Sequence, residues 1–249
     1  MTPPLSPLSP LATVGPSLAW YLTRSTGAVA LLLLTLAVAL GVADVQRWSS
    51  PRWPRFVVDG LHRSISLLAL VFLVLHILTA VLDTFAPISP LAAFVPFVSS
   101  YRPFWLGLGA VAFDLLLAVI LTSLLRARVG ARVWRAAHWL VYACWPVALL
   151  HALGTGSDVR SDWLLVLSAV CLAVVFAAVL VRTLGSWAAP ARVRGLALGG
   201  CAAFTVGLVL WLPSGPLGSG WARRSGTPTS LLGHSSAAGT SSSRIVVGP

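Results

Sequence analysis

The stretch LHRSISLLALVFLVLHILTAVLD, residues 61–83, is long and apolar enough to cross a membrane, yet it carries a histidine near each end. A helix needs about 20 apolar residues to cross a hydrocarbon core that is about 30 Å thick. The step from His62 to His76 corresponds to a rise of about 21 Å along a helix and falls within about 40° of four full turns. The sequence therefore predicts two imidazoles on the same side of one helix, at two different depths.

The rest of the chain is equally apolar. Of its 249 residues, 57% are hydrophobic and 9% are charged, and the mean hydropathy is +0.90, which is far from the balance of a soluble domain. Backbone groups in lipid must be satisfied within the segment, which favours helices. The predicted fold class is all-α, a polytopic membrane protein with a six-helix bundle. The six predicted spans are approximately 18–42, 57–82, 104–125, 134–153, 163–183 and 194–212.

The two ends of the chain differ in composition from the predicted membrane domain, residues 18–212. Residues 1–17 are rich in Pro and Ser and contain no basic residue, so they predict a disordered segment and not a cleavable signal peptide. Residues 213–249 are rich in Gly and Ser, which predicts a disordered tail.

The basic residues predict the orientation of the bundle. All 17 are arginine. Ten lie in the connections that follow the first, third and fifth predicted helices: Arg47, Arg52, Arg55, Arg126, Arg128, Arg132, Arg135, Arg182, Arg192 and Arg194. The positive-inside rule places this side in the cytoplasm and both termini outside, which predicts a multi-pass protein of the cell membrane. The net charge of +11 is thus expected to face membrane lipid and not nucleic acid.

A second histidine pair lies in the fourth predicted helix, which runs parallel to the second. Ionisable residues inside a membrane are costly and point to function. The sequence predicts two layers, with His138 beside His62 and His151 beside His76. However, the step from His138 to His151 leaves them about 140° short of four turns. Because Pro146 lies between them and removes a backbone donor, we expect a local distortion of the helix there.

The two layers are too far apart to share one metal ion, because metal–imidazole bonds are only about 2 Å long. Each layer could instead hold a flat cofactor, and haem fits because neutral imidazole is a common axial ligand of its iron. Two stacked b-type haems would form a path for electrons. Two alternatives remain open: a proton or transition-metal transporter that uses the same histidines, and a single-haem membrane subunit of a periplasmic reductase.

The spacing of these histidines, together with YLTRSTGAVALLLL at residues 21–34, resembles the ferric reductase-like transmembrane domain of ferric-chelate reductases and NADPH oxidases. The resemblance covers about residues 18–185. It implies two haems, one ligated by His62 and His138 and the other by His76 and His151. It also implies that Arg24 pairs with a propionate of the outer haem. Arg63, next to His62, is expected either to face an inner propionate or to lie at the cytoplasmic surface.

The oxidases of this family continue into modules that bind FAD and NADPH, whereas this sequence has no GxGxxG motif before a helix. The passage RVWRAAHWLVYACWPVALLHALGTGSD, residues 132–158, resembles actinobacterial members that consist of the membrane domain alone. This predicts an electron-transfer component of an oxidoreductase without an NAD(P)H or FAD domain of its own. Its expected partners are a separate flavoprotein or quinol as donor and an acceptor on the outer face. That acceptor could be a periplasmic or extracellular redox protein such as a methionine sulfoxide reductase.

Two further features have open roles. Asp114 lies near the centre of the third predicted helix, where it could hydrogen-bond a neighbouring helix, pair with an arginine or take up a proton. The outer connection, residues 84–102, is apolar and Pro-rich, and it could cap the outer haem or form a docking surface. The arginine clusters are expected to bind anionic lipid, or alternatively to dock an acidic flavoprotein.

Overall fold

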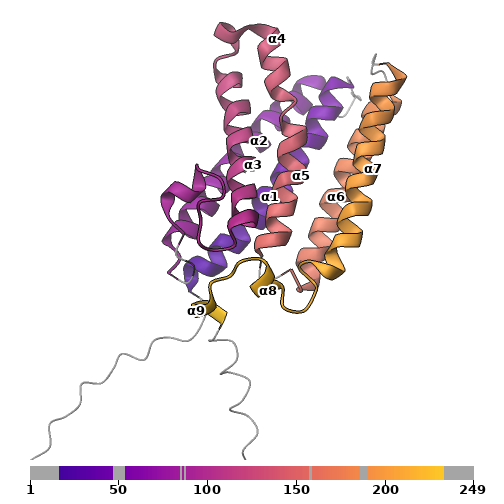
Figure 1. Cartoon of the computed structure of the whole chain (residues 1–249). Helices are drawn as coiled ribbons and strands as arrows, with labels where there is room; N and C mark the ends of the chain where they lie inside the picture. The colour runs from indigo at the N-terminus through magenta and orange to yellow at the C-terminus, as the bar shows by residue number, and fades with distance from the viewer. Residues whose placement is uncertain are drawn as a thin grey trace, which may run out of the picture.

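The computed structural model describes residues 17–46, 54–84, 86, 88–156, 159–185 and 190–232. In this part of the chain all regular structure is helical, and the long helices run side by side in one bundle (Figure 1). The prediction of an all-α polytopic membrane protein is therefore confirmed. The helices are α1 (Leu18–Val45), α2 (Arg55–Leu82), the 3₁₀ turn η1 (Pro90–Ala93), α3 (Pro103–Leu124), α4 (Arg126–His138), α5 (Val141–Thr155), α6 (Asp162–Leu184), α7 (Ala191–Ser214), α8 (Trp221–Arg224) and α9 (Thr229–Leu232).

Five of these helices, α1, α2, α3, α6 and α7, are each long and apolar enough to cross a membrane. The sixth predicted span, residues 134–153, is divided between α4 and α5, which are bent by 46° relative to each other. The number of spans is six when this bent pair is counted as one.

The connection between α3 and α5 is a helical hairpin that turns at Gly130. This residue has a φ of 78° and a ψ of 162°, a conformation that glycine adopts without the strain a side chain would add. The chain rises through the start of α4, reverses, and descends toward α5, so that α4 projects beyond the other helices (Figure 1). We call this end of the bundle the α4 end and the opposite one the α8 end.

Packing in the bundle joins helices that are neighbours in the chain and helices that are distant in it. The helix α1 lies along α2, α3 lies along α5, and α6 contacts both α1 and α7. A buried hydrogen bond links α5 to α1 in the core, where the Trp145 indole Nε1–H donates to Oγ1 of Thr35 at 2.9 Å. Leu149 and Cys171 are fully buried beside it. The centre of the bundle is therefore formed by α1, α5 and α6, whereas α2 and α7 are mostly exposed toward the surroundings.

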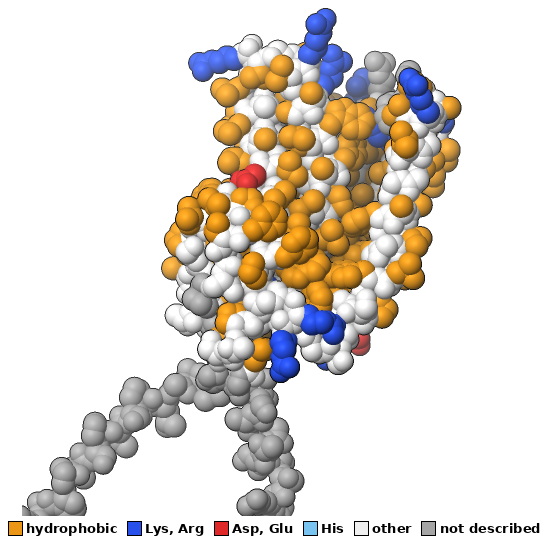
Figure 2. Space-filling model, in the orientation of Figure 1, with side chains coloured by type: hydrophobic (Ala, Val, Ile, Leu, Met, Phe, Trp, Pro, Cys, Tyr) orange, Lys and Arg blue, Asp and Glu red, His pale blue; other side chains and the backbone are white. Residues whose placement is uncertain are grey.

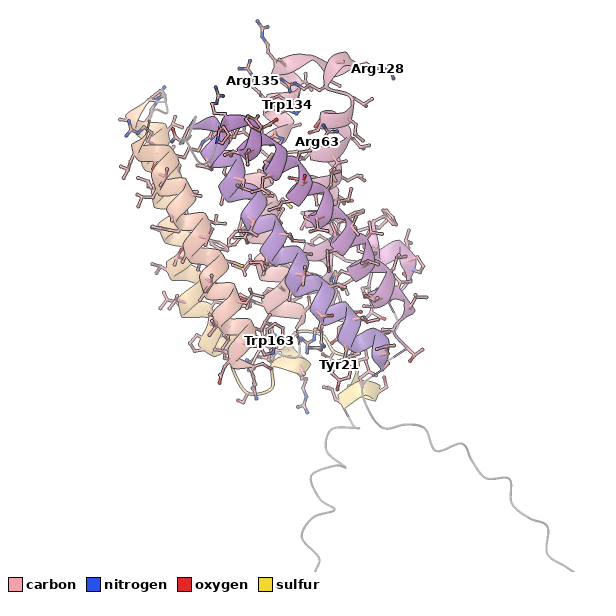
Figure 3. All side chains as sticks on the ribbon, turned by 180° about the vertical axis from the view of Figure 1, so that it is seen from behind. Tyr21, Arg63, Arg128, Trp134, Arg135 and Trp163 are labelled. Atoms are coloured by element: carbon pink, nitrogen blue, oxygen red, sulfur yellow. The ribbon has the colours of Figure 1, made fainter. Side chains whose placement is uncertain are left out.

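The surface divides into zones that suit a membrane. Figure 2 shows a wide band of hydrophobic side chains, with arginines gathered at the α4 end and fewer at the α8 end. Figure 3 places Arg128, Trp134 and Arg135 at the α4 end, and Tyr21 and Trp163 at the α8 end. The first and the last described residues, 17 and 232, both lie at the α8 end of the bundle (Figure 1). The assignment of the α4 end to the cytoplasm stays a prediction from its arginines.

The C-terminal segment differs from the expected disordered tail at residues 213–232. Here α7 continues to Ser214, and the following residues form turns, α8 and α9 across the α8 end (Figure 1). Trp221 anchors this segment, because its ring lies 5.2 Å from that of Trp105 and 5.7 Å from that of Trp211. Large aromatic contacts outweigh the polar composition of the segment. The remaining predicted disordered residues, 1–16 and 233–249, lie outside the described part of the chain.

A buried arginine ties three segments together at the same end. Arg102, which is 4% exposed, has its side chain donating to the carbonyl oxygens of Gly154 (3.1 Å) and Thr155 (2.9 Å) and to Oγ1 of Thr227 (3.0 Å). Its backbone N–H donates to the carbonyl oxygen of Gly226 at 3.0 Å. Burial lowers the pKa of the guanidinium. Arg102 therefore joins the connection 84–102, the end of α5 and the C-terminal segment.

Candidate functional site

Four histidines face one another inside the bundle in two pairs. The rings of His62 on α2 and His138 at the end of α4 have centroids 6.5 Å apart and planes at 68°. The rings of His76 on α2 and His151 on α5 have centroids 6.2 Å apart and planes at 81°. The structure thus brings together the two pairs that the sequence predicts, the first toward the α4 end and the second toward the α8 end.

The separation of the rings suits two imidazoles that share one metal ion. With metal–nitrogen bonds of about 2 Å and about 1.2 Å from each ring centroid to its nitrogen, two imidazoles on opposite sides of one metal ion would have centroids about 6.4 Å apart. The two measured separations, 6.5 Å and 6.2 Å, lie on either side of this value. The residues present therefore fit bis-histidine ligation of a haem iron at each level.

Three of the four imidazoles are fixed by a hydrogen bond from Nδ1 to a main-chain carbonyl. The bonds are His76 to Thr23 (2.7 Å), His62 to Ala37 (2.9 Å) and His151 to Trp105 (2.9 Å). A carbonyl oxygen only accepts, so Nδ1 carries a proton, and in the neutral imidazole Nε2 then keeps a free lone pair. Metal-ligating histidines commonly have this arrangement, since it fixes the tautomer and the orientation of the ring.

His138 is different. Its Nδ1 is buried and has no hydrogen-bond partner among the described residues, and its ring lies 5.3 Å from that of Trp134. Directly after it, Trp139 and Leu140 separate α4 from α5. The layer toward the α4 end is therefore held less tightly than the other.

The expected distortion between His138 and His151 is present, as a bend of 46° between α4 and α5. Pro146 lies inside α5, whereas the break comes six residues earlier, at Leu140. There the backbone N–H groups of Leu140, Tyr142 and Ala143 donate to the carbonyl three residues before. Such bonds turn the chain by about 120° per residue instead of about 100°, which recovers part of the missing rotation.

A largely apolar cavity of about 280 Å³ surrounds the pair toward the α8 end. Its walls come from α1, α2, α3, α5, the start of α6 and the connection 84–102. His76 and His151 line it, as do Arg24, Trp20 and Tyr101. An apolar cavity with a few placed polar groups is the usual form of a cofactor site.

The two candidate arginines occupy different surroundings. The guanidinium carbon of Arg24 lies 3.6 Å from the centroid of the Trp20 ring, so its charge is held in the cavity wall by a cation–π contact. Arg63 is exposed on α2 at the α4 end (Figure 3). The structure therefore places Arg24 with the pair of His76 and leaves Arg63 at the surface.

The two features with open roles are also located. Ala86, Ile88, Ala92 and Tyr101 of the connection 84–102 line the cavity, which fits a cap over this pair. Asp114 does not belong to the cavity wall, although its neighbour Phe113 does.

Sequence reasoning missed three glycines that touch the imidazoles. A Cβ on Gly27 would lie 2.8 Å from Nδ1 of His76, and one on Gly109 would lie 2.6 Å from Nδ1 of His151. A Cβ on Gly41 would lie 3.3 Å from Cε1 of His62. The sequence does contain a signal for two of them, because Gly27 and Gly41 have the same spacing as His76 and His62.

Comparison with known protein families gives one match. Residues 26–149 match the family described as "Ferric reductase like transmembrane component". The matched segment includes His62, His76 and His138 and ends two residues before His151. No curated protein and no solved structure matches the chain.

Proposed function

Because residues 26–149 of this chain belong to the family of ferric reductase-like transmembrane components, we propose that the protein carries electrons across the membrane through two b-type haems. His62 and His138 would hold one haem, and His76 and His151 would hold the other. The observation that carries this proposal is the pair of ring separations, 6.5 Å and 6.2 Å, at two levels of one bundle.

Haems bound at these two sites would supply one-electron chemistry, and two imidazoles on each iron would leave no open position for oxygen. The protein holds and tunes them. Main-chain carbonyls fix three of the four ligand rings. The apolar cavity around His76 and His151 excludes water, and the guanidinium of Arg24 in its wall is positioned to balance a propionate charge.

We assign electron entry to the α4 end. The arginines of α4 are all exposed: Arg126, Arg128, Arg132 and Arg135. The same helix ends at His138, a proposed ligand, so a donor that docks on these charges is brought close to the first iron. An acidic flavoprotein fits this surface better than an uncharged quinol, because complementary charge accelerates encounter. For each electron that the donor loses, an acceptor at the α8 end gains one.

Haem content tests the proposed function directly. Protein purified from haem-replete cells should contain two haems per chain in the pyridine haemochrome assay and show the spectrum of low-spin b-type haem. One haem per chain would favour the single-haem subunit. A colourless preparation would overturn the proposal and favour the transporter.

If an acidic donor docks on the arginines of α4, the rate of haem reduction should depend on their charge. Replacing Arg128 and Arg132 by glutamate should slow haem reduction by flavodoxin, a small acidic flavoprotein, about tenfold at low ionic strength, and salt should abolish the difference. Stopped-flow absorbance measures this rate. Arg223→Glu, at the exposed α8 end, is the matched control and should leave the rate unchanged. Equal slowing in the control, or no dependence on salt, would contradict a docking site on α4.

A further inference from the structure

The three hydrogen-bonded imidazoles share one local arrangement on the helix that they contact. In each case the carbonyl that accepts from Nδ1 belongs to residue i, and the residue at i+4 is a glycine that the ring touches. The pairs of acceptor and glycine are Thr23 and Gly27 for His76, Ala37 and Gly41 for His62, and Trp105 and Gly109 for His151.

Helix geometry explains this combination. The carbonyl of residue i already accepts the N–H of residue i+4, so a side chain reaches its second lone pair only from beside residue i+4. A Cβ at that position would occupy the space of the ring. On Gly27 it would lie 2.8 Å from Nδ1 of His76, and on Gly109 it would lie 2.6 Å from Nδ1 of His151, closer than real Cβ contacts.

Among the described glycines, close contact with an imidazole is specific to these three, since a Cβ on Gly107 or Gly154 would instead meet Phe97 or Trp105. In α7, a Cβ on Gly199 or Gly207 would meet nothing within 4 Å. His138, whose Nδ1 has no partner among the described residues, is also absent from the contacts of every described glycine.

We propose that Gly27, Gly41 and Gly109 are positioning residues that set the rotation of the ligand imidazoles. Each leaves room for one ring to lie against α1 or α3, where Nδ1–H donates to the main chain and Nε2 remains available for iron. This inference rests on the proposed function. It adds residues that touch no iron but determine how the ligands present themselves to it.

The test replaces each glycine by alanine, with Gly199→Ala and Gly207→Ala as controls. Haem per chain and the electron paramagnetic resonance of the ferric protein are measured, because the low-spin signal responds to ligand rotation. Gly27→Ala and Gly109→Ala should shift the signal of the centre bound by His76 and His151, or reduce the haem content from two to one. Gly41→Ala should shift the signal of the centre bound by His62 and His138. This shift should be smaller than the other two, since the Cβ would be 3.3 Å from Cε1 of His62. The controls should match the parent protein.

A double-mutant cycle covers the case in which an alanine variant folds poorly. Gly27→Ala should lower the midpoint of thermal unfolding in the parent, and it should have no such effect in the His76→Ala background, where the ring is gone. Equal destabilisation in both backgrounds would overturn the inference, and so would unchanged spectra and haem content in all three variants. Either result leaves the proposed function intact if the parent binds two haems. A parent without haem would instead reject the proposed function.

Discussion

His76→Ala and His151→Ala are each expected to reduce the haem content from two to one per chain, with loss of the centre toward the α8 end. Truncation removes one of two imidazoles that face each other at 6.2 Å in an apolar cavity, where no other described histidine is paired with them. The low-spin spectrum of the remaining centre should be retained, because His62 and His138 lie at a separate level. Pyridine haemochrome content and electron paramagnetic resonance measure both effects.

His62→Ala and His138→Ala form the reciprocal pair and should remove the other centre. Parallel loss of both haems in all four single variants would contradict two independent levels. Of the four, His138→Ala should disturb the polypeptide least, because the Nδ1 of His138 has no hydrogen-bond partner among the described residues.

Arg102→Ala is expected to lower the free energy of unfolding by about 2–4 kcal/mol, because it removes a buried cation and leaves buried carbonyl groups without their donor. The side chain bonds the carbonyl oxygens of Gly154 and Thr155 and the hydroxyl of Thr227. Arg102 also holds a left-handed backbone conformation with a φ of 43°, which these bonds stabilise. Thermal unfolding in detergent measures the loss. The unfolding midpoint of Arg102→Lys should lie between those of the parent protein and Arg102→Ala.

Arg160→Ala is the matched control for Arg102→Ala. Arg160 also donates to main-chain carbonyl oxygens, those of Leu217 (3.4 Å) and Gly218 (2.9 Å), but it is exposed, so water replaces the lost bonds. Its replacement should change the unfolding midpoint little. Similar losses for the two variants would show that burial of Arg102 contributes nothing.

The sequence predicted the pairing of the histidines well because helix periodicity is a strong constraint. The spacing of His62 and His76 fits nearly four turns, and the structure places both toward a partner. The spacing of His138 and His151 fits no straight helix, and the correction was attributed to Pro146. The structure breaks the helix at Trp139 and Leu140, within the segment where the distortion was expected, and several N–H groups there donate to the carbonyl three residues before.

Contacts between distant segments were beyond the reach of composition and spacing. The tail from residue 213 was judged from its many small polar residues, although Trp221 packs against Trp105 and Trp211 and orders the first part of it. Sequence reasoning assigned no structural role to Arg102. Its partners, Gly154 and Thr227, lie far away in the chain, and only the folded structure brings them together.

The two histidine levels have a consequence for energetics. They are separated by a rise of about 21 Å along α2, which is roughly two thirds of a hydrocarbon core of about 30 Å. Under the proposed function, each transfer between them moves a negative charge through most of the electric field across the bilayer. A full crossing is worth about 2.3 kcal/mol per 100 mV, so electron flow would be electrogenic. With the interior negative, the membrane voltage itself would drive electrons outward.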